Sequence, residues 1–268
     1  MGAIVENVSI EKSINKTYRK TIFRPFIEAI KEFELIKPND KIAVCISGGK
    51  DSFLLAKCLQ ILKKHKEFVF DLEFIVMDPG YSKENINQIK KNLKLFEIDA
   101  HIFKAPIFNF IENTEKPCYL CAKMRRGYLY DKAQELGCNK IALGHHFNDV
   151  IETVILNMVF NGVYASMMPK LKSDNFENME LIRPLYYIKE KDIINFKNYN
   201  NLVFLDCACV ITKKDIGKRK EVKDFIDNMK KLYPQVDSNI LNSTKNVNLN
   251  KVIGCEKDGK DIFFLDDY

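Results

Sequence analysis

Short apolar runs alternate with amphipathic segments over most of the chain. The apolar runs, which suit buried strands, lie near residues 41–46, 71–77, 99–103, 140–144 and 180–183. The segments with helical periodicity lie near 52–65, 83–96, 121–136, 148–161 and 190–199. Strands and helices that alternate in this way form a parallel sheet with helices on both faces. The pattern predicts an α/β fold with a doubly wound, mostly parallel, Rossmann-like sheet.

The two ends of the chain differ from this centre. Residues 10–36 suit a basic helical lead-in, in which 17–24 carry three cations and two aromatic rings. That stretch has the chemistry to contact RNA, but packing against the core is the favoured interpretation. A charged amphipathic helix is expected over 213–233, and the Asn-rich tail after it has no recognisable chemistry. We therefore expect three parts: a lead-in over 1–36, a central domain over 37–210, and a C-terminal helix and tail over 211–268.

Composition narrows the class of protein. The 268 residues are 46% hydrophobic, which is enough for a full core, and no apolar run approaches the length that spans a membrane. Without a secretory signal, a cytoplasmic protein with free thiols is expected. The 42 basic residues outnumber the 36 acidic ones, giving a net charge of +6. This balance favours a polyanionic partner.

The segment Ser47-Gly-Gly-Lys-Asp-Ser52 is the most informative one, because it joins a buried strand to a helix. Gly48 and Gly49 let main-chain N–H groups approach an anion, and the helix start adds free N–H groups. The serines add hydroxyl donors, Lys50 adds a cation, and Asp51 suits a magnesium contact. The alternative is an ordinary turn capped by Asp51 or Ser52. The loop matches neither the Gly-x-x-x-x-Gly-Lys-Ser/Thr nor the Gly-x-Gly-x-x-Gly fingerprint.

Four cysteines have the spacing of a metal or redox site. Cys118 and Cys121 form a Cys-x-x-Cys pair followed by Arg125 and Arg126, and Cys207 and Cys209 lie beyond. Three thiolates would leave one corner of an iron–sulfur cluster open, whereas four would close a zinc site. The other cysteines that fall in the apolar pattern are expected to be small buried apolar residues: Cys45, Cys58 and Cys138.

A third segment repeats the strand–turn–helix pattern. Its strand covers 141–143, and the residues with chemistry come directly after it: Gly144, His145, His146, Asp149, Glu152 and Thr153. Offsets of three and four put the helical members on one face with a histidine, at the carboxyl edge of the sheet. Asp149 is the favoured functional residue, while Glu152 suits a solvated face equally well.

Together these segments resemble the TtcA-type family of tRNA 2-thiocytidine synthetases, within the ATP pyrophosphatase superfamily. The resemblance rests on the loop Ser47–Ser52, on Cys118 to Arg126, on Gly144 to Asp149, and on the stretches 168–171 and 182–185. It covers about residues 15–210 and implies an adenine-nucleotide α-hydrolase-like fold, with the pyrophosphatase domain over 37–210.

The family resemblance also implies a reaction and its residues. ATP is cleaved between its α and β phosphates, and a base carbonyl of tRNA is activated as its adenylate. The implied catalytic residues are Lys50, Asp51, Arg125 and Asp149. The implied ATP-binding residues are Ser47, Gly48, Gly49, Lys50, Asp51, Ser52, Asp78, Gly144 and His145. The resemblance implies that ATP binds together with Mg²⁺.

Sulfur transfer in this family uses a 4Fe-4S cluster, which the resemblance assigns to Cys118, Cys121 and Cys207. Typical members carry Pro-Cys-x-x-Cys where this chain has Asp206-Cys-Ala-Cys209, so Cys209 is the alternative third ligand. A sulfur donor, either a cysteine desulfurase or sulfide, is also implied, and dimers are common in the family.

Two other functions are open at this point. The first is a metal-free thiolase of the 2-thiouridine type, in which Cys118 and Cys121 form a persulfide and disulfide relay. The second is an ATP-binding module that senses redox state through its cysteines and transfers no sulfur. The sequence also leaves open whether cytidine or uridine is the target.

Overall fold

The structure is a computed structural model that describes residues 7–65, 67, 69–107, 117–205 and 216–266. Its main sheet has the strand order β3-β2-β1-β4-β6-β5, and every neighbouring pair is parallel except β5 with β6. The strands are β1 (Asp40–Cys45), β2 (Phe70–Asp78), β3 (His101–Lys104), β4 (Lys140–Ala142), β5 (Lys170–Lys172) and β6 (Glu180–Ile182). This arrangement confirms the predicted α/β fold. The short antiparallel edge strand β5 was not predicted.

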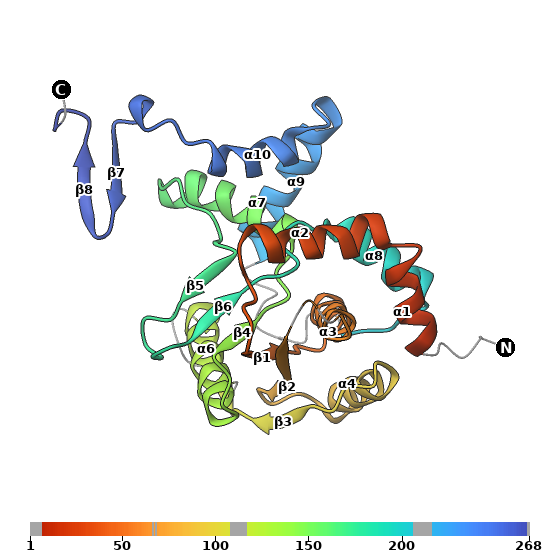
Figure 1. The fold of residues 1–268 in the computed structure, drawn as a ribbon. Coiled ribbons are helices and arrows are strands. Elements are labelled where there is room, and N and C mark those ends of the chain that lie inside the picture. The colour runs from red at the N-terminus through yellow and green to blue at the C-terminus, as the bar shows by residue number, and fades with distance from the viewer. Residues whose placement is uncertain (1–6, 66, 68, 108–116, 206–215, 267–268) are drawn as a thin grey trace.

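Helices cover both faces of the sheet (Figure 1). Ile42 and Val44 of β1 face a core formed with α3 (Lys50–Lys63), α4 (Lys83–Leu95) and α8 (Glu190–Tyr199). Ala43 and Cys45 face the opposite core, which includes Tyr130 of α6 (Pro117–Glu135). Alternate residues of one strand therefore lie in two cores, as expected for a doubly wound sheet.

The lead-in belongs to the larger core. It consists of α1 (Asn7–Asn15), the π-helix η1 (Arg19–Phe23) and α2 (Arg24–Glu32). Ile22 and Phe26 are fully buried, and the Tyr18 ring packs edge-on against Phe196 of α8 at 5.8 Å. The packing interpretation of this segment is confirmed.

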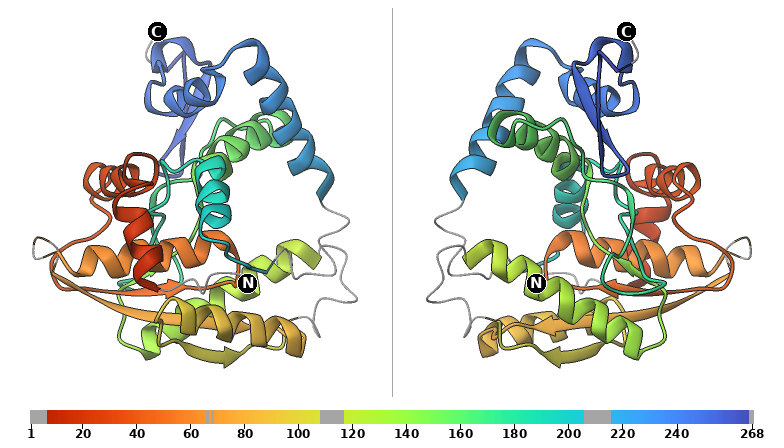
Figure 2. Two further views of the ribbon diagram at one scale, coloured as in Figure 1. Left: turned by 90° about the vertical axis from the view of Figure 1, so that its right-hand side faces the viewer. Right: turned by 90° about the vertical axis from the view of Figure 1, so that its left-hand side faces the viewer.

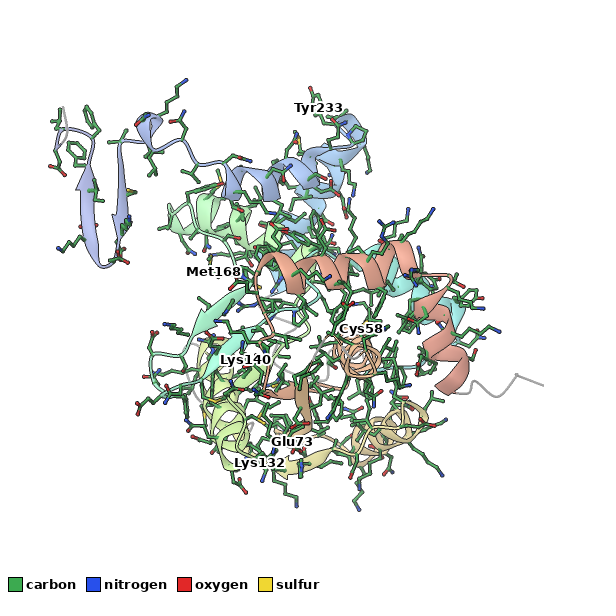
Figure 3. All side chains as sticks on the ribbon, viewed as in Figure 1. Cys58, Glu73, Lys132, Lys140, Met168 and Tyr233 are labelled. Carbon is green, nitrogen blue, oxygen red and sulfur yellow. The ribbon has the colours of Figure 1, made fainter. Side chains whose placement is uncertain are left out.

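The C-terminal segments gather at the end of the molecule opposite β3 (Figures 1 and 2). Helix α9 (Ile216–Leu232) matches the predicted one, and Tyr233 stands at its outer end (Figure 3). Three later elements were not predicted from the sequence: α10 (Val236–Lys245), the 3-10 turn η4 (Leu249–Lys251) and the hairpin of β7 (Gly254–Lys257) and β8 (Lys260–Phe263). Helix α10 is held by Asp237, whose carboxylate pairs with Lys189 at 2.9 Å and Lys230 at 2.5 Å.

At the amino edge of the sheet, away from the loop after β1, Lys140 is 2% exposed (labelled in Figure 3). Its ammonium lies 2.9 Å from Asp40 and 3.0 Å from Glu180, and it donates to the Leu35 carbonyl. Each of its three protons therefore has an acceptor, which is what a buried ammonium needs.

The three cysteines expected in the core are buried there. Cys45, Cys58 and Cys138 are each less than a tenth exposed, and burial raises the pKa of the Cys138 thiol to about 11. They remain thiols at neutral pH, which confirms the packing prediction. Within the described ranges, no helix is long and apolar enough to cross a bilayer.

Candidate functional site

The loop after β1 has the backbone that the sequence predicted. Gly48 has φ +93°, a conformation that residues with a side chain adopt only under strain, so this position favours glycine. Gly49 is the N-cap of α3 and has no side chain with which to cap it. The N–H groups of the first turn of α3 are therefore available to an anion.

Two serines give this loop its shape. Ser52 is buried, and its hydroxyl donates to the Gly49 carbonyl at 2.9 Å. The same oxygen accepts from the Ser47 main-chain N–H at 3.2 Å and from the Ser47 hydroxyl at 3.3 Å. The first and last residues of the loop are thus held together, which curves the backbone between them into a cradle.

Asp51 has one engaged oxygen and one orphaned oxygen. Its Oδ2 lies 3.2 Å from Lys50 Nζ, whereas its Oδ1 is buried and has no hydrogen-bond partner in the part of the chain that the structure describes. His146 Nε2 lies 3.9 Å from Oδ1, too far for a hydrogen bond. Burial raises the pKa of Asp51. A buried carboxylate oxygen without a donor fits a bound cation.

Lys50 is shared with a residue that sequence reasoning missed. Its ammonium lies 3.4 Å from Glu190 Oε1, and the other oxygen of Glu190 pairs with Lys223 of α9 at 2.6 Å. Glu190 opens α8, at the residue where a helix was predicted to start, but a glutamate in a first helical turn is too common to mark a site. The loop lysine is therefore held by carboxylates in this structure.

Asp149 lies in the first turn of α7 (Phe147–Leu156), and both of its carboxylate oxygens contact protein groups. It forms a capping box with His146, whose main-chain N–H donates to Asp149 Oδ2 at 2.9 Å. Its other oxygen lies 2.7 Å from Arg219 Nη2. To bind a cation, Asp149 has to exchange one of these partners. The same arginine pairs with Glu152, which is buried, so the solvated-face interpretation of Glu152 is wrong.

Gly144 and Asp78 shape the walls around the loop. A Cβ on Gly144 would lie 3.1 Å from the main chain of Asp51, so this glycine lets two backbones meet. Asp78 Oδ1 accepts the N–H groups of Gly80 and Tyr81, which closes the turn after β2. The Tyr81 hydroxyl then donates to the Ser47 carbonyl at 3.4 Å.

The described part of the cysteine site lies at the same sheet edge. Cys121 of α6 is buried against Met77, near the end of β2, and against Ala105 and Ile107 after β3. Cys118 precedes it by one turn of α6. The side chain of Cys118, and all of Cys207 and Cys209, lie outside the described residues. Within the described ranges, no three His, Cys, Asp or Glu side chains form a metal site.

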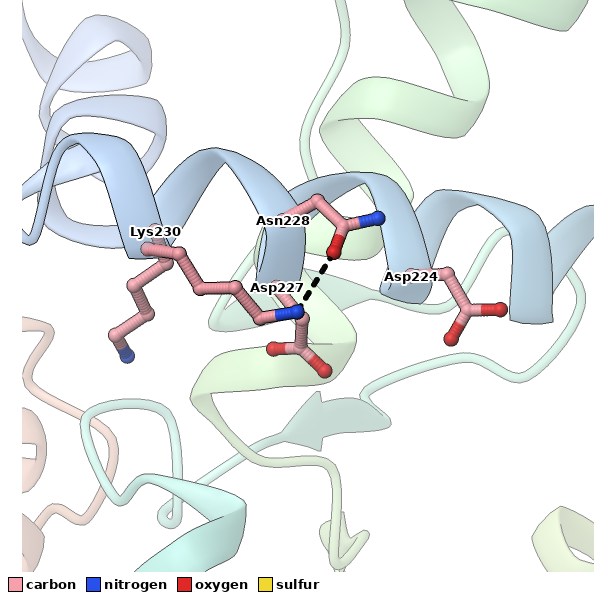
Figure 4. Close-up of a pocket in the computed structure, with 5 residues that line it drawn as sticks. Asp224, Asp227, Asn228 and Lys230 are labelled. Atoms are coloured by element: carbon pink, nitrogen blue, oxygen red, sulfur yellow. Dashed lines mark hydrogen bonds between the residues drawn. The ribbon is translucent and has the colours of Figure 1, made fainter.

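A separate hollow lies on the outer surface of α9 (Figure 4). One helix alone lines it, through Asp224, Asp227, Asn228, Lys230 and Lys231. Lys231 donates to Asn228 at 2.9 Å. None of the residues around the Ser47–Ser52 loop lines it, so it is not part of this site.

Comparison with known proteins identifies the family. The PP-loop domain family matches residues 10–208. A tRNA-cytidine(32) 2-sulfurtransferase of Geobacter metallireducens is 35% identical over 236 residues, 87% of this chain and 91% of that protein. The enzyme of the same name from Aeromonas hydrophila is 36% identical, covering 85% and 76%.

A solved structure, the U34-tRNA thiolase NcsA from Methanococcus maripaludis with its [4Fe-4S] cluster, has the same fold. The TM-score is 0.64 at 22% identity, over 87% of this chain and 82% of that one. On the sequence matches, the chain belongs to the PP-loop family of tRNA-cytidine(32) 2-sulfurtransferases.

Proposed function

We propose that the chain replaces the C2 oxygen of a tRNA cytidine with sulfur, using ATP and a 4Fe-4S cluster. The observation that carries this proposal is the shared position of two parts. The Ser47–Ser52 loop follows β1, and Cys121 packs against residues at or just after the ends of β2 and β3. Carboxyl ends of parallel strands meet at one edge, so activation and sulfur delivery would take place side by side.

In this proposal the loop holds the phosphates of ATP. The N–H groups of Gly48, Gly49 and the first turn of α3 would cradle the pyrophosphate, and Lys50 would exchange Glu190 for a phosphate oxygen. The orphaned oxygen of Asp51 would receive Mg²⁺, with Asp149 as a second ligand after it leaves Arg219.

The base is then activated and substituted. The C2 oxygen attacks the α-phosphorus and pyrophosphate leaves, so the base becomes an adenylate. Lys50 and Arg125 would offset the negative charge that develops on the phosphate. Sulfide next attacks C2, the C–O bond breaks, and AMP leaves with the former base oxygen. ATP is thus spent on turning a poor leaving group into a good one.

The cysteines would hold the cluster. Cys121 is a buried thiol at the carboxyl edge of the sheet, where the Ser47–Ser52 loop also lies, and Cys118 lies one turn before it. With Cys207, or Cys209 in its place, three thiolates would bind the cluster and leave its fourth iron to carry the sulfide. A cysteine desulfurase or free sulfide would supply that sulfur. We expect the enzyme in the cytoplasm, with tRNA as its partner, and as a dimer.

The test is an anaerobic preparation assayed for iron, sulfide and tRNA thiolation by nucleoside mass spectrometry. Alanine variants at Cys118, Cys121, Cys207 and Cys209 are compared with Cys138→Ala, which alters a buried cysteine of the core. Brown protein with about four irons per chain, lost in three of the four variants but kept in Cys138→Ala, is expected.

Other results select the alternatives. A colourless protein that still thiolates tRNA would point to the persulfide relay, and stoichiometric zinc would give the cysteines a structural role. Pyrophosphate release that tRNA does not stimulate, with no thiolated nucleoside, would leave only the redox-sensing module.

A further inference from the structure

Arg183 is a buried cation next to the candidate site. It follows β6 at the carboxyl edge of the sheet and is 8% exposed. Its Nε donates to His145 Nδ1 at 3.3 Å, and its Nη1 donates to the Met168 carbonyl. These two contacts leave three of its five N–H groups without an acceptor among the described residues.

The charge of Arg183 has no carboxylate partner in the described part of the chain. No acidic oxygen there lies within 4.0 Å of its guanidinium, whereas buried Lys140 has two acidic partners. His145 does not balance the charge either, because burial and nearby cations lower the pKa of His145 to about 4. The ring is therefore neutral at pH 7, and it carries its proton on Nε2 because Nδ1 accepts from Arg183.

A second arginine, Arg126, lies on α6 one turn before Tyr130, whose side chain belongs to the same core cluster as Leu181 of β6, two residues before Arg183. Arg126 of α6 is exposed, makes no hydrogen bond to a described residue, and lies close enough to help burial lower the pKa of Arg183 to about 10. The positive charges of both guanidinium groups act on Tyr130, one turn further along α6, and oppose the rise that burial causes in its pKa. Two cations that repel each other, with no described carboxylate within ion-pair distance of either, form an arrangement that an anion stabilises.

The position of the pair indicates the class of anion. His145 follows Gly144, which packs directly against the backbone of Asp51 in the nucleotide loop. An anion bound by Arg183 would therefore sit beside the phosphates held by that loop, on the side of helix α6. Planar guanidinium groups with free N–H pairs suit the paired oxygens of a phosphate.

We propose that Arg183 and Arg126 form a second phosphate site next to the Ser47–Ser52 loop. This inference rests on the proposed function. The phosphate is either the α-phosphate of the nucleotide and adenylate or a backbone phosphate of the tRNA beside the target base. His145 acts as a positioning residue that holds the Arg183 guanidinium in place.

Measuring the affinity for three ligands distinguishes the nucleotide α-phosphate from the tRNA backbone phosphate. AMP carries the α-phosphate alone, inorganic pyrophosphate probes the loop alone, and unmodified tRNA probes the backbone contact. Each is titrated calorimetrically into the anaerobic wild-type protein and the variants Arg183→Gln, Arg183→Lys and Arg126→Gln. Lys94→Gln, which removes an exposed cation from the last turn of α4, is the control.

If the site holds the α-phosphate, Arg183→Gln weakens AMP binding by about tenfold to a hundredfold and leaves pyrophosphate binding unchanged. If it holds the RNA backbone, only tRNA binding weakens, and the slope of log affinity against log salt falls by about one. Arg183→Lys keeps the positive charge but loses the planar pair of N–H donors. Its affinity for the ligand that Arg183→Gln binds more weakly should therefore lie between those of the wild type and Arg183→Gln. Arg126→Gln changes an exposed side chain and gives the same test if Arg183→Gln fails to fold.

Unchanged binding of AMP and tRNA in folded Arg183→Gln and Arg126→Gln overturns the second site. That result differs from failure of the proposed function, in which the wild-type protein itself binds neither pyrophosphate nor tRNA. A loss of affinity equal to that of Lys94→Gln also overturns it, because such a loss would reflect net charge alone.

Discussion

Arg219 Nη2 lies 2.7 Å from Asp149 Oδ1, so the C-terminal helix α9 is tied to the first turn of α7, next to the nucleotide loop. Nε of the same guanidinium lies 2.9 Å from Glu152 Oε2. Burial raises the pKa of Glu152, and Arg219 opposes that rise. The arginine thus compensates one buried carboxylate while it occupies another that the proposed reaction needs.

Replacing Arg219 should cost stability. Arg219→Gln leaves buried Glu152 without its cation, and we expect the free energy of unfolding at pH 7 to fall by about 1–2 kcal/mol, since Arg219 itself is half exposed. Urea denaturation measures this. Lys220→Gln removes the same charge from an exposed position of α9 and should change stability by less than about 0.5 kcal/mol. Equal losses in both variants would mean that the ion pair contributes nothing specific.

Asp51→Asn should separate catalysis from folding. Burial opposes the charge of this carboxylate, so a neutral amide of the same shape should leave the free energy of unfolding unchanged or slightly higher. Pyrophosphate release in the presence of tRNA and Mg²⁺ should fall by about a hundredfold or more, because the cation loses its ligand. Asp71→Asn, at an exposed surface pair with Lys63, is the control for both measurements. A variant that keeps full activity would remove Asp51 from the magnesium site.

Gly144→Ala should disturb the nucleotide loop directly. The new Cβ would lie 3.1 Å from the main chain of Asp51 and Ser52, and neither backbone can yield without moving the first turn of α3. We expect ATP binding, measured calorimetrically, to be weaker by about tenfold or more. Gly127→Ala is the matched control, because its Cβ meets nothing within 4 Å and it lies inside α6. That variant should be more stable by about 0.5–1 kcal/mol and bind ATP normally. Normal ATP binding by Gly144→Ala would show that the loop tolerates the displacement.

The mostly parallel sheet and the loop could be predicted because the signals were local, whereas the order of the strands was not predicted. Five apolar runs separated by amphipathic segments are enough for a parallel sheet, and glycines after a buried strand are enough for an anion loop. Strand β5 has only three residues and lies on the sheet edge, so no periodicity marks it. Helix α10 depends on the ion pairs of Asp237 with Lys189 and Lys230, which both lie outside the helix, and its Asn-rich sequence does not indicate a helix.

The partners within the site could not be predicted, because they come from residues far apart in the sequence. Glu190 meets Lys50 across 140 positions, and Arg219 meets Asp149 across 70. Arg183 lies within a family-like stretch, but only its burial without a described carboxylate partner indicates an anion site. Proximity of charges is a property of the fold, whereas the residue types that can cradle a phosphate are already visible in the chain.

Asp237 should make the stability of the C-terminal segments depend on pH. Lys230 and Lys189 stabilise its ionised form against the cost of burial and lower its pKa from 3.8 to about 2. Because the folded pKa is the lower one, the carboxylate stabilises the fold fully above about pH 4. This contribution is lost as the pH falls from there through 2. We expect this carboxylate to contribute about 1–2 kcal/mol to the free energy of unfolding, because the two lysines are partly exposed and solvent weakens the ion pairs.

The measurement compares the wild-type protein with Asp237→Asn by urea denaturation at several pH values from about 7 to about 3. The wild type should be more stable by that amount at pH 7, and the difference should shrink as the pH drops below about 4, because a protonated Asp237 resembles the amide. Exposed Asp227 on α9 makes no ion pair with a described residue, so Asp227→Asn should show a small difference that stays constant with pH. A difference for Asp237→Asn that grows toward low pH would have the wrong sign for a depressed pKa, and α10 would then be held by its apolar contacts alone.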